Sequence, residues 1–246
     1  MSAASPVLSI VIPAFNEERR LPRALGLIRE WMDARALQAE LIVVDEGSTD
    51  GTAAVVYQFR DQFPMLYLLT TGDRNHGKGY AVRTGMLAAR GRLALFTDAD
   101  LSAPIEEADK LLAALEHCEV AIGSRALDRS LIQVHQARRR ELAGILFNWA
   151  VQCLTGLPFA DTQCGFKAFV TDRARILFEQ QRIQGFGFDP EILFLAKRHG
   201  LRTKEVPVRW SHDSATKVRV LRDGLRMATD LLRIRWNSFR GRYPKQ

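Results

Sequence analysis

Short apolar segments alternate with helix-length segments through the first half of the chain. Five segments are too evenly hydrophobic to keep one face in water, which is typical of buried parallel strands; they are residues 7–12, 41–44, 66–69, 93–96 and 120–122. Between them, apolar residues recur every three or four positions, as at Leu21, Leu25 and Ile28, and this spacing predicts helices that pack on a sheet. The pattern predicts an α/β fold in which helices flank an open, mostly parallel sheet.

The second half of the chain has a less regular pattern. Apolar spacing predicts helices at 136–154, 188–199 and 218–240 and strands at 165–170 and 203–210. No linker divides the chain, and 246 residues with 47% hydrophobic content can bury one full core. We therefore expect a single domain over residues 1–246.

Positive charge is concentrated near the end of the chain. The formal net charge is +7, and residues 202–246 hold twelve Lys and Arg against four Asp and Glu. A localised basic segment indicates a surface for anions and does not by itself indicate nucleic acid. The three cysteines have no paired spacing, and the first residues lack a secretory signal, so we expect a cytoplasmic protein without disulfides or zinc.

The nineteen residues 142–160 carry no charge, which approaches the length of a membrane-spanning helix. Asn148, Gln152 and Pro158 interrupt this segment, so we expect no span. It is either a half-buried helix or a helix that lies on a membrane surface. The same alternatives hold for the last helix, where apolar residues at helical spacing accompany several cations; the spaced residues are Val218, Leu221, Leu225, Ala228, Leu232 and Arg235, with Lys217, Arg219, Arg222, Arg226 and Arg233.

Acidic and polar residues directly follow the predicted strands. Ligands of open α/β sheets bind at the carboxyl ends of strands, and residues 13–17, 45–51 and 98–100 follow the first, second and fourth strands. Two neighbouring carboxylates, Asp98 and Asp100, would repel each other unless a cation neutralised them. Hard oxygen ligands favour Mg²⁺ or Mn²⁺. The alternative is a solvated turn that caps a helix.

The segment 72–79 nearly matches a phosphate-binding P-loop, with Gly72, Gly77 and Lys78 at the required spacing. Gly79 stands where the magnesium-binding Ser or Thr belongs, so a P-loop phosphotransferase is the weaker alternative. A nucleotide-binding or nucleic-acid-binding module without a reaction is a further alternative, suggested by the basic end of the chain. Lys78 can still bind an anion.

Several motifs, taken in order, resemble glycosyltransferase family 2, whose members have the GT-A fold. They are IVIPAFNEE at 10–18, DEGSTDGT at 45–52, DAD at 98–100, GSR at 123–125, DTQCGFK at 161–167 and GFDPE at 187–191. Within this family, the chain is most similar to dolichyl-phosphate β-glucosyltransferases and related polyprenyl-phosphate glycosyltransferases. The resemblance covers nearly the whole chain.

The resemblance implies a role for each motif. The nucleotide sugar would be bound by Pro13, Ala14, Asn16, Glu17, Asp45, Lys78, Asp98 and Ala99. Asp98 and Asp100 would hold Mg²⁺ or Mn²⁺ against its diphosphate, while Arg125 and Asp161 would complete the catalytic set beside the sugar and acceptor. Residues 1–125 would form the nucleotide-sugar-binding half, and residues 126–246 the acceptor half with its basic C-terminal helix.

Two positions depart from the family pattern. Glu46 replaces the second of two aspartates that usually open the second loop, and Ser102 replaces a glutamine that helps mannosyl relatives to coordinate the metal. The second departure favours UDP-glucose over GDP-mannose as the donor.

The expected activity is an inverting, metal-dependent transfer of a hexose to a polyprenyl or dolichyl phosphate. A lipid phosphate is already anionic near neutral pH, so no strong general base is required, and the five scattered histidines agree with this. Another nucleotide sugar, such as GDP-mannose, or a soluble acceptor is the alternative. We expect peripheral binding to the cytoplasmic face of a membrane and no nucleic-acid partner.

Overall fold

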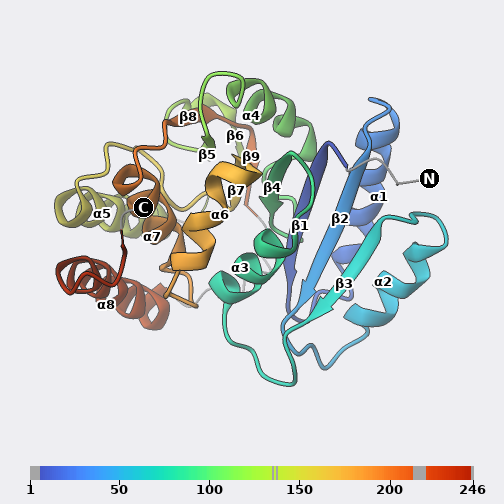
Figure 1. Cartoon of the computed structure of the whole chain (residues 1–246), viewed down its shortest axis with the longest axis horizontal. Coiled ribbons are helices and arrows are strands. Elements are labelled where there is room, and N and C mark those ends of the chain that lie inside the picture. Colours follow the sequence, from blue (N-terminus) through green and yellow to red (C-terminus); the bar gives the residue numbers. More distant parts are fainter. Residues whose placement is uncertain (1–5, 135, 137, 213–219, 245–246) are drawn as a thin grey trace.

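A computed structural model describes residues 6–134, 136, 138–212 and 220–244, and its centre is a seven-stranded sheet in the order β3-β2-β1-β4-β7-β5-β8 (Figure 1). The strands are β1 (Leu8–Ala14), β2 (Ala39–Asp45), β3 (Leu66–Thr70), β4 (Leu93–Thr97), β5 (Val120–Ser124), β7 (Phe166–Val170) and β8 (Thr203–Pro207). Two short strands, β6 (Ile132–Val134) and β9 (Trp210–Ser211), pair separately. The helices are α1 (Leu21–Asp33), α2 (Thr52–Arg60), α3 (Lys78–Ala88), α4 (Ala108–Ala114), α5 (Arg138–Thr155), α6 (Thr171–Gln180), α7 (Phe188–Arg198) and α8 (Val220–Phe239).

The central strands contain unbroken apolar segments because helices cover both faces of the sheet. Ile10 and Ile12 of β1 belong to a core formed with α1, α2 and α4. Val11, between them, belongs to a second core formed with α3, α6 and α7. Period-two alternation in a strand sends neighbouring side chains to opposite faces, so a strand buried on both faces needs an unbroken apolar segment. The predicted α/β fold is confirmed.

Strand β7 is the exception to the parallel sheet, since it runs antiparallel between β4 and β5. Phe166, its first residue, pairs with Thr97, the last residue of β4. An antiparallel strand begins at the edge where its parallel neighbours end. The segment before β7 is therefore carried to the carboxyl edge of the sheet.

The second half differs from the predicted elements in two places. The strand expected at 203–210 is divided, because β8 pairs with β5 whereas β9 pairs with β6. Helix α6 was not predicted, although its buried Ala174, Leu177 and Phe178 have helical spacing. The other predicted strands and helices are confirmed, and none of the ends predicted by number is shifted by more than two residues.

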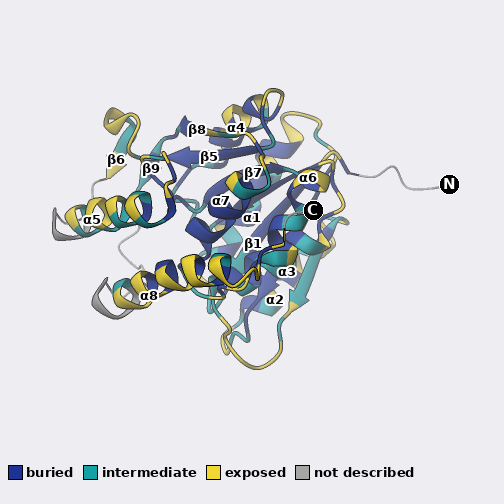
Figure 2. Cartoon of the chain, turned by 60° about the vertical axis from the view of Figure 1, so that its left-hand side comes forward, coloured by how far each residue is buried: buried dark blue, intermediate teal, exposed yellow. Residues whose placement is uncertain are grey.

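Helices α5 and α8 pack side by side, and much of their surface faces solvent (Figure 2). In α8, Met227, Leu231 and Ile234 are buried, whereas Leu225 and Leu232, two members of the predicted apolar set, are exposed. Residues 217–219 of that set lie outside the described residues, as do the side chains of Leu221, Arg222 and residues 138–140. Across the described ranges, no helix combines the length and apolarity needed to cross a bilayer.

Candidate active site

The loops after β1 and β2 are locked together at the carboxyl edge of the sheet. The backbone N–H of Asn16 donates to Oγ of Ser48 at 2.8 Å, and Oδ1 of Asn16 accepts from the N–H of Thr49 at 2.8 Å. Asn16 has φ +54°, a left-handed conformation that asparagine tolerates better than most residues. The N–H of Glu17 donates to Oγ1 of Thr52 at 2.8 Å. These hydrogen bonds hold the two loops together at the carboxyl edge of the sheet.

Asp45 is the last residue of β2 and lies opposite Ala14, the last residue of β1. Its side chain is buried, and Oδ1 accepts from the N–H of Ser48 at 3.0 Å. Its second oxygen has no hydrogen-bond partner in the described part of the chain. An acid at this place in a nucleotide-binding sheet can accept hydrogen bonds from a ribose or base.

Glu46, the departure from the family pattern, holds the loop before α3. Its Oε2 accepts from the backbone N–H of Gly77 at 2.7 Å, while Oε1 is buried without a partner among the described residues. Burial raises the pKa of Glu46 to about 7, although the N–H groups of Gly77 and His76 oppose the rise. The longer acid therefore links the end of β2 to the start of α3.

Lys78 and Asp98 form an ion pair at the centre of this edge. The Nζ of Lys78, the first residue of α3, lies 2.6 Å from Oδ1 of Asp98, which directly follows β4. Burial opposes the charge on Lys78, but the carboxylates of Asp98 and Asp189 raise its pKa, so this residue is a cation. The segment that nearly matches a P-loop therefore places Lys78 beside the carboxylate of Asp98. Gly79 is required for packing, because a Cβ there would lie 2.7 Å from Phe188.

Asp100 is the second carboxylate of the DAD motif. Burial and the charge of Asp98 raise its pKa, and its Oδ1 accepts from the N–H of Ser102 at 2.9 Å. Leu101, between Asp100 and Ser102, has φ +47°, which is strained for a bulky side chain. Such strain often marks a functional turn.

The DAD carboxylates fit a divalent cation in their chemistry. Two like charges in a half-buried setting favour a neutralising cation, and carboxylate oxygens suit Mg²⁺ or Mn²⁺. Within the described ranges, no three His, Cys, Asp or Glu side chains are grouped closely enough to hold a metal alone. A metal at Asp98 and Asp100 would therefore need further oxygen ligands, such as those of a diphosphate.

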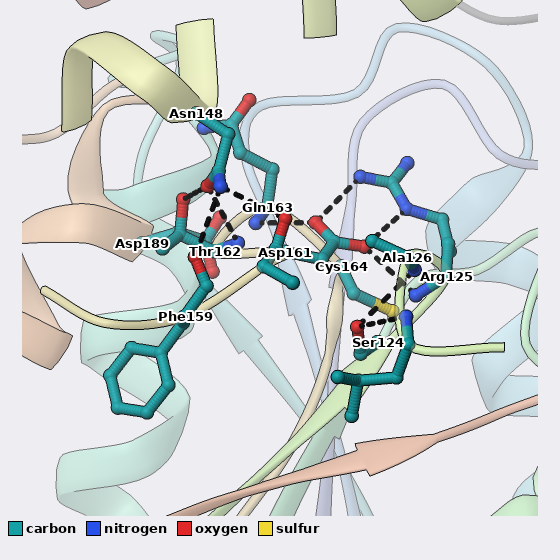
Figure 3. Close-up of polar contacts among 12 residues, drawn as sticks. Ser124, Arg125, Ala126, Asn148, Phe159, Asp161, Thr162, Gln163, Cys164 and Asp189 are labelled. Atoms are coloured by element: carbon teal, nitrogen blue, oxygen red, sulfur yellow. Dashed lines mark hydrogen bonds and ion pairs between the residues drawn. The ribbon is translucent and has the colours of Figure 1, made fainter. Parts of the chain in front are cut away.

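Arg125 and Asp161 form a two-pronged ion pair beyond the end of β5 (Figure 3). Nε and Nη2 of Arg125 lie 2.6 and 2.9 Å from the two oxygens of Asp161. Burial alone would raise the pKa of Asp161, but the guanidinium holds it at about 2. Nη1 of Arg125 has no hydrogen-bond partner among the described residues.

The loop that carries Asp161 is held by two residues that were not predicted from the sequence. Asn148 of α5 donates to the carbonyl oxygens of Phe159 and Ala160 at 3.0 and 2.9 Å (Figure 3). Glu205 of β8 accepts from the N–H of Asp161 at 2.7 Å. Asn148 interrupts an apolar segment, which was the available signal, whereas Glu205 stands beside Lys204 in a mixed segment and gave none. Arg125 therefore pairs with an aspartate whose loop backbone is held by both α5 and β8.

A second buried ion pair, between Lys167 and Asp189, lies next to this loop. Nζ of Lys167 is 2.5 Å from Oδ1 of Asp189 and 2.6 Å from the carbonyl oxygen of Cys164. Both residues stand in motifs that carry the family resemblance, but no role was assigned to them. Their charge is fully buried, so this pair fixes the start of β7 against α7.

The predicted site residues gather at one edge of the sheet, in two groups. Those at the ends of β1, β2 and β4 and at the start of α3 are Pro13, Ala14, Asn16, Glu17, Asp45, Lys78, Asp98, Ala99 and Asp100. Arg125 and Asp161 form the second group. The side chains of Ala14 and Ala99 pack in the core, so only their backbone can contact a ligand.

Known proteins are similar in sequence to this chain over most of its length. The model of glycosyl transferase family 2 matches residues 9–164. A dolichyl-phosphate beta-glucosyltransferase of Drosophila melanogaster is 36% identical, covering 92% of this chain and 74% of its own length. The enzymes of that name in Trichomonas vaginalis and Homo sapiens are 34% and 32% identical, covering 92% and 95% of this chain and 72% and 76% of their own.

A solved structure shares the fold over the whole chain. Glucosyl-3-phosphoglycerate synthase of Mycobacterium tuberculosis, in complex with Mn²⁺ and UDP-glucose, aligns with a TM-score of 0.67 at 20% identity. The alignment covers 99% of this chain and 81% of that one. The family predicted from the motifs is confirmed: the chain belongs to glycosyl transferase family 2 and has the GT-A fold.

Proposed function

We propose that the chain transfers glucose from UDP-glucose to a polyprenyl or dolichyl phosphate, with inversion at the sugar. The family and the names of the relatives support this choice of donor and acceptor. The donor occupies the edge formed by the ends of β1, β2 and β4, and the acceptor phosphate lies at Arg125.

One observation carries the proposal. The short segment from Asp161 to Gly165 contacts both the Arg125–Asp161 pair and the Lys78–Asp98 pair. Asp161 pairs with Arg125, and Gly165, four residues later, packs against the other pair. A Cβ on Gly165 would collide with the carboxylate of Asp98 and lie 2.9 Å from Nζ of Lys78. In this proposal, a leaving diphosphate at Lys78 and an entering phosphate at Arg125 lie at the two ends of this segment and meet on one sugar.

The residues supply charge rather than a base. A phosphate oxygen of the acceptor attacks C1 of the glucose from the side opposite UDP, the bond from C1 to the diphosphate oxygen breaks, and UDP leaves with the electron pair. This single displacement converts an α-linked donor into a β-linked product. The Lys78 ammonium stabilises the leaving group. Nη1 of Arg125 binds the acceptor phosphate, while Asp161 keeps the guanidinium oriented.

Asp98 and Asp100 are the residues that would hold Mg²⁺ or Mn²⁺. When bound, the metal would supply positive charge against the diphosphate. The two half-buried carboxylates and the oxygen ligands of the donor suit such an ion.

The acceptor implies contact with a membrane, and α5 and α8 offer a surface for it. Exposed apolar side chains on α5 include Leu146 and Trp149, and those on α8 include Trp236 and Phe239, of which Phe239 is 83% exposed. Arg233 and Arg235 lie among them on α8, and Arg240 directly follows the helix. Each cation near an anionic surface contributes about 1 kcal/mol, so we infer reversible binding to the anionic, cytoplasmic face of a membrane.

The test is transfer of radiolabelled sugar into an organic extract. The full chain, with dolichyl phosphate in detergent and Mg²⁺, should label lipid from UDP-glucose and not from GDP-mannose, and the product should be β-linked by NMR. R125Q should raise the KM for dolichyl phosphate while UDP-glucose still binds. R202Q is the matched control, because Arg202 pairs with Glu119 at the opposite edge of β5 and β8. Label that enters only a water-soluble acceptor would contradict the proposal.

A further inference from the structure

A cavity of about 540 Å³ lies outside the site described above, between the loop before α3, the loop before α7 and one face of α8. Its α8 residues recur at helical spacing; they are Arg226, Met227, Thr229, Asp230, Arg233 and Asn237. Its volume is in the range of small-molecule sites. No step of the proposed reaction uses these residues.

The lining of this cavity has more cations than anions. Arg182, Arg226 and Arg233 face a single acid, Asp230. Arg233 lies 3.1 Å from Oδ1 of Asp230, which is buried against Gly187, so these two charges offset each other. The guanidinium of Arg226 has no hydrogen bond to any described residue. That of Arg182 contacts only the carbonyl oxygen of Arg242, at 3.3 Å, within the described ranges.

The walls of the cavity are preformed. The backbone N–H of Arg182 donates to both oxygens of Glu191 at 3.1 Å, and Glu191 is held in turn by Tyr243 at 2.6 Å. Gly77, which also lines the cavity, packs so closely on the loop before α7 that a Cβ would lie 2.6 Å from the carbonyl oxygen of Gln184. A ligand would therefore meet a loop, including Arg182, whose backbone is already fixed.

The cavity and the donor edge use different residues of the loop that precedes α3. Residues 72–74 of that loop pack on Gly47, beyond the end of β2, whereas Gly77 packs on Gln184 beside the cavity. Lys78 follows Gly77 and contacts Asp98. Neither Lys78 nor the DAD carboxylates line the cavity, although the cavity adjoins the loop that positions Lys78.

We propose that this cavity is a second anion site, which binds the phosphate or diphosphate group of a ligand through Arg182 and Arg226. Guanidinium groups match phosphate oxygens in two-pronged hydrogen bonds, so a phosphate ester is the chemical class that fits. The source is either a soluble phosphate ester or the headgroup of a lipid. The site does not depend on the proposed reaction or on a divalent metal.

The experiment is calorimetric titration of the full chain with inorganic pyrophosphate in excess EDTA. We expect saturable binding, weakened about tenfold by R226Q because one charged hydrogen-bonding group is lost. R235Q, on the same helix but outside the cavity, should bind as the wild type does. D98N should also bind normally, which separates this site from the donor site. Unchanged melting temperatures of the variants show that they are folded.

Three results would overturn the site: no pyrophosphate binding by the wild type, equal binding by R226Q and wild type, or an equal loss in R235Q. Loss of binding in D98N would also overturn it, since the anion would then occupy the donor edge. Vesicles of phosphatidylcholine with phosphatidic acid distinguish the two sources. Displacement of pyrophosphate by these vesicles assigns the site to a lipid headgroup, and its retention assigns the site to a soluble phosphate ester.

Discussion

The ammonium of Lys78 lies 2.6 Å from a carboxylate oxygen of Asp98, and Gly165 packs directly against both groups. One lysine cannot neutralise Asp98 and the neighbouring Asp100 together, so the edge keeps an excess of negative charge for a cation. The absence of a side chain at position 165 is what allows β7 to start beside this pair.

Gly165→Ala should therefore impair catalysis. A methyl group at residue 165 would collide with the carboxylate of Asp98 and displace Lys78, and a displacement of about 1 Å can cost on the order of 100-fold in rate. Steady-state transfer assays measure the effect. Gly26→Ala is the control, because its Cβ in α1 would meet nothing within 4 Å. Equal kcat for both variants would refute the packing argument.

Asp161→Asn should destabilise the protein. The change leaves the charge of Arg125 without its partner, and breaking a buried ion pair in this way costs about 3 kcal/mol. The pKa of Asp161 is held at about 2, below its ordinary value of 3.8, so the pair stabilises fully above pH 3.8 and loses this contribution as pH falls toward 2. Urea unfolding should show a constant difference from wild type between about pH 5 and pH 8. A difference that vanishes at neutral pH would contradict this.

Glu46 should make the stability of the fold depend on pH in the opposite direction. Burial raises the pKa of Glu46 from 4.5 to about 7, with a smaller contribution from the charge of Asp45. Its stabilising protonated form is complete below pH 4.5 and lost as pH rises through about 7, so the free energy of unfolding falls across that window.

Glu46→Gln should remove this fall while keeping the length that reaches Gly77. Thermal unfolding at several pH values measures it. Glu116→Gln, a change at an exposed acid, should keep the wild-type profile. If Glu46→Gln has the same pH profile as wild type, the carboxyl does not titrate in this range.

Membrane binding should depend on the apolar side chains of α5 and α8. Replacing Leu146, Trp149 and Phe239 together with Ser should lower binding to anionic vesicles by at least about tenfold, because burial of each contributes about 1.5–3 kcal/mol. Tyr57→Ser on α2 is the control at an exposed aromatic residue. Vesicle sedimentation gives the measurement, and binding should weaken with added salt. Equal recovery of both variants with the vesicles would exclude this surface.

The parts of the fold that were predictable are those buried on both faces. Strands β1, β2, β4 and β5 each contain an unbroken apolar segment, and this feature is local in the sequence. Antiparallel pairing of β7 has no local signal, because an apolar strand of five residues fits either direction. The segment 203–210 is divided because β8 pairs with β5 whereas β9 pairs with β6. These pairings are also a tertiary property without a local signal.

In the candidate site, residues that end strands were predictable and residues that connect distant segments were not. Asp45 and Asp98 stand out because a charge follows an apolar strand. The contact of Glu46 with Gly77 spans 31 positions, and that of Lys167 with Asp189 spans 22. Long-range pairs of this kind follow from the sheet order, which the sequence pattern did not contain.

The most direct test of the central claim is calorimetric titration of the full chain with UDP-glucose, with Mg²⁺ and then with EDTA. The proposal predicts saturable binding with Mg²⁺ that is lost in EDTA and in both D98N and D100N, while melting temperatures show that the variants are folded. Asp109→Asn, at an exposed acid of α4, should bind as the wild type does. Equal binding of UDP-glucose in EDTA, or undiminished binding by D98N and D100N, would contradict a metal-dependent donor site at this edge of the sheet.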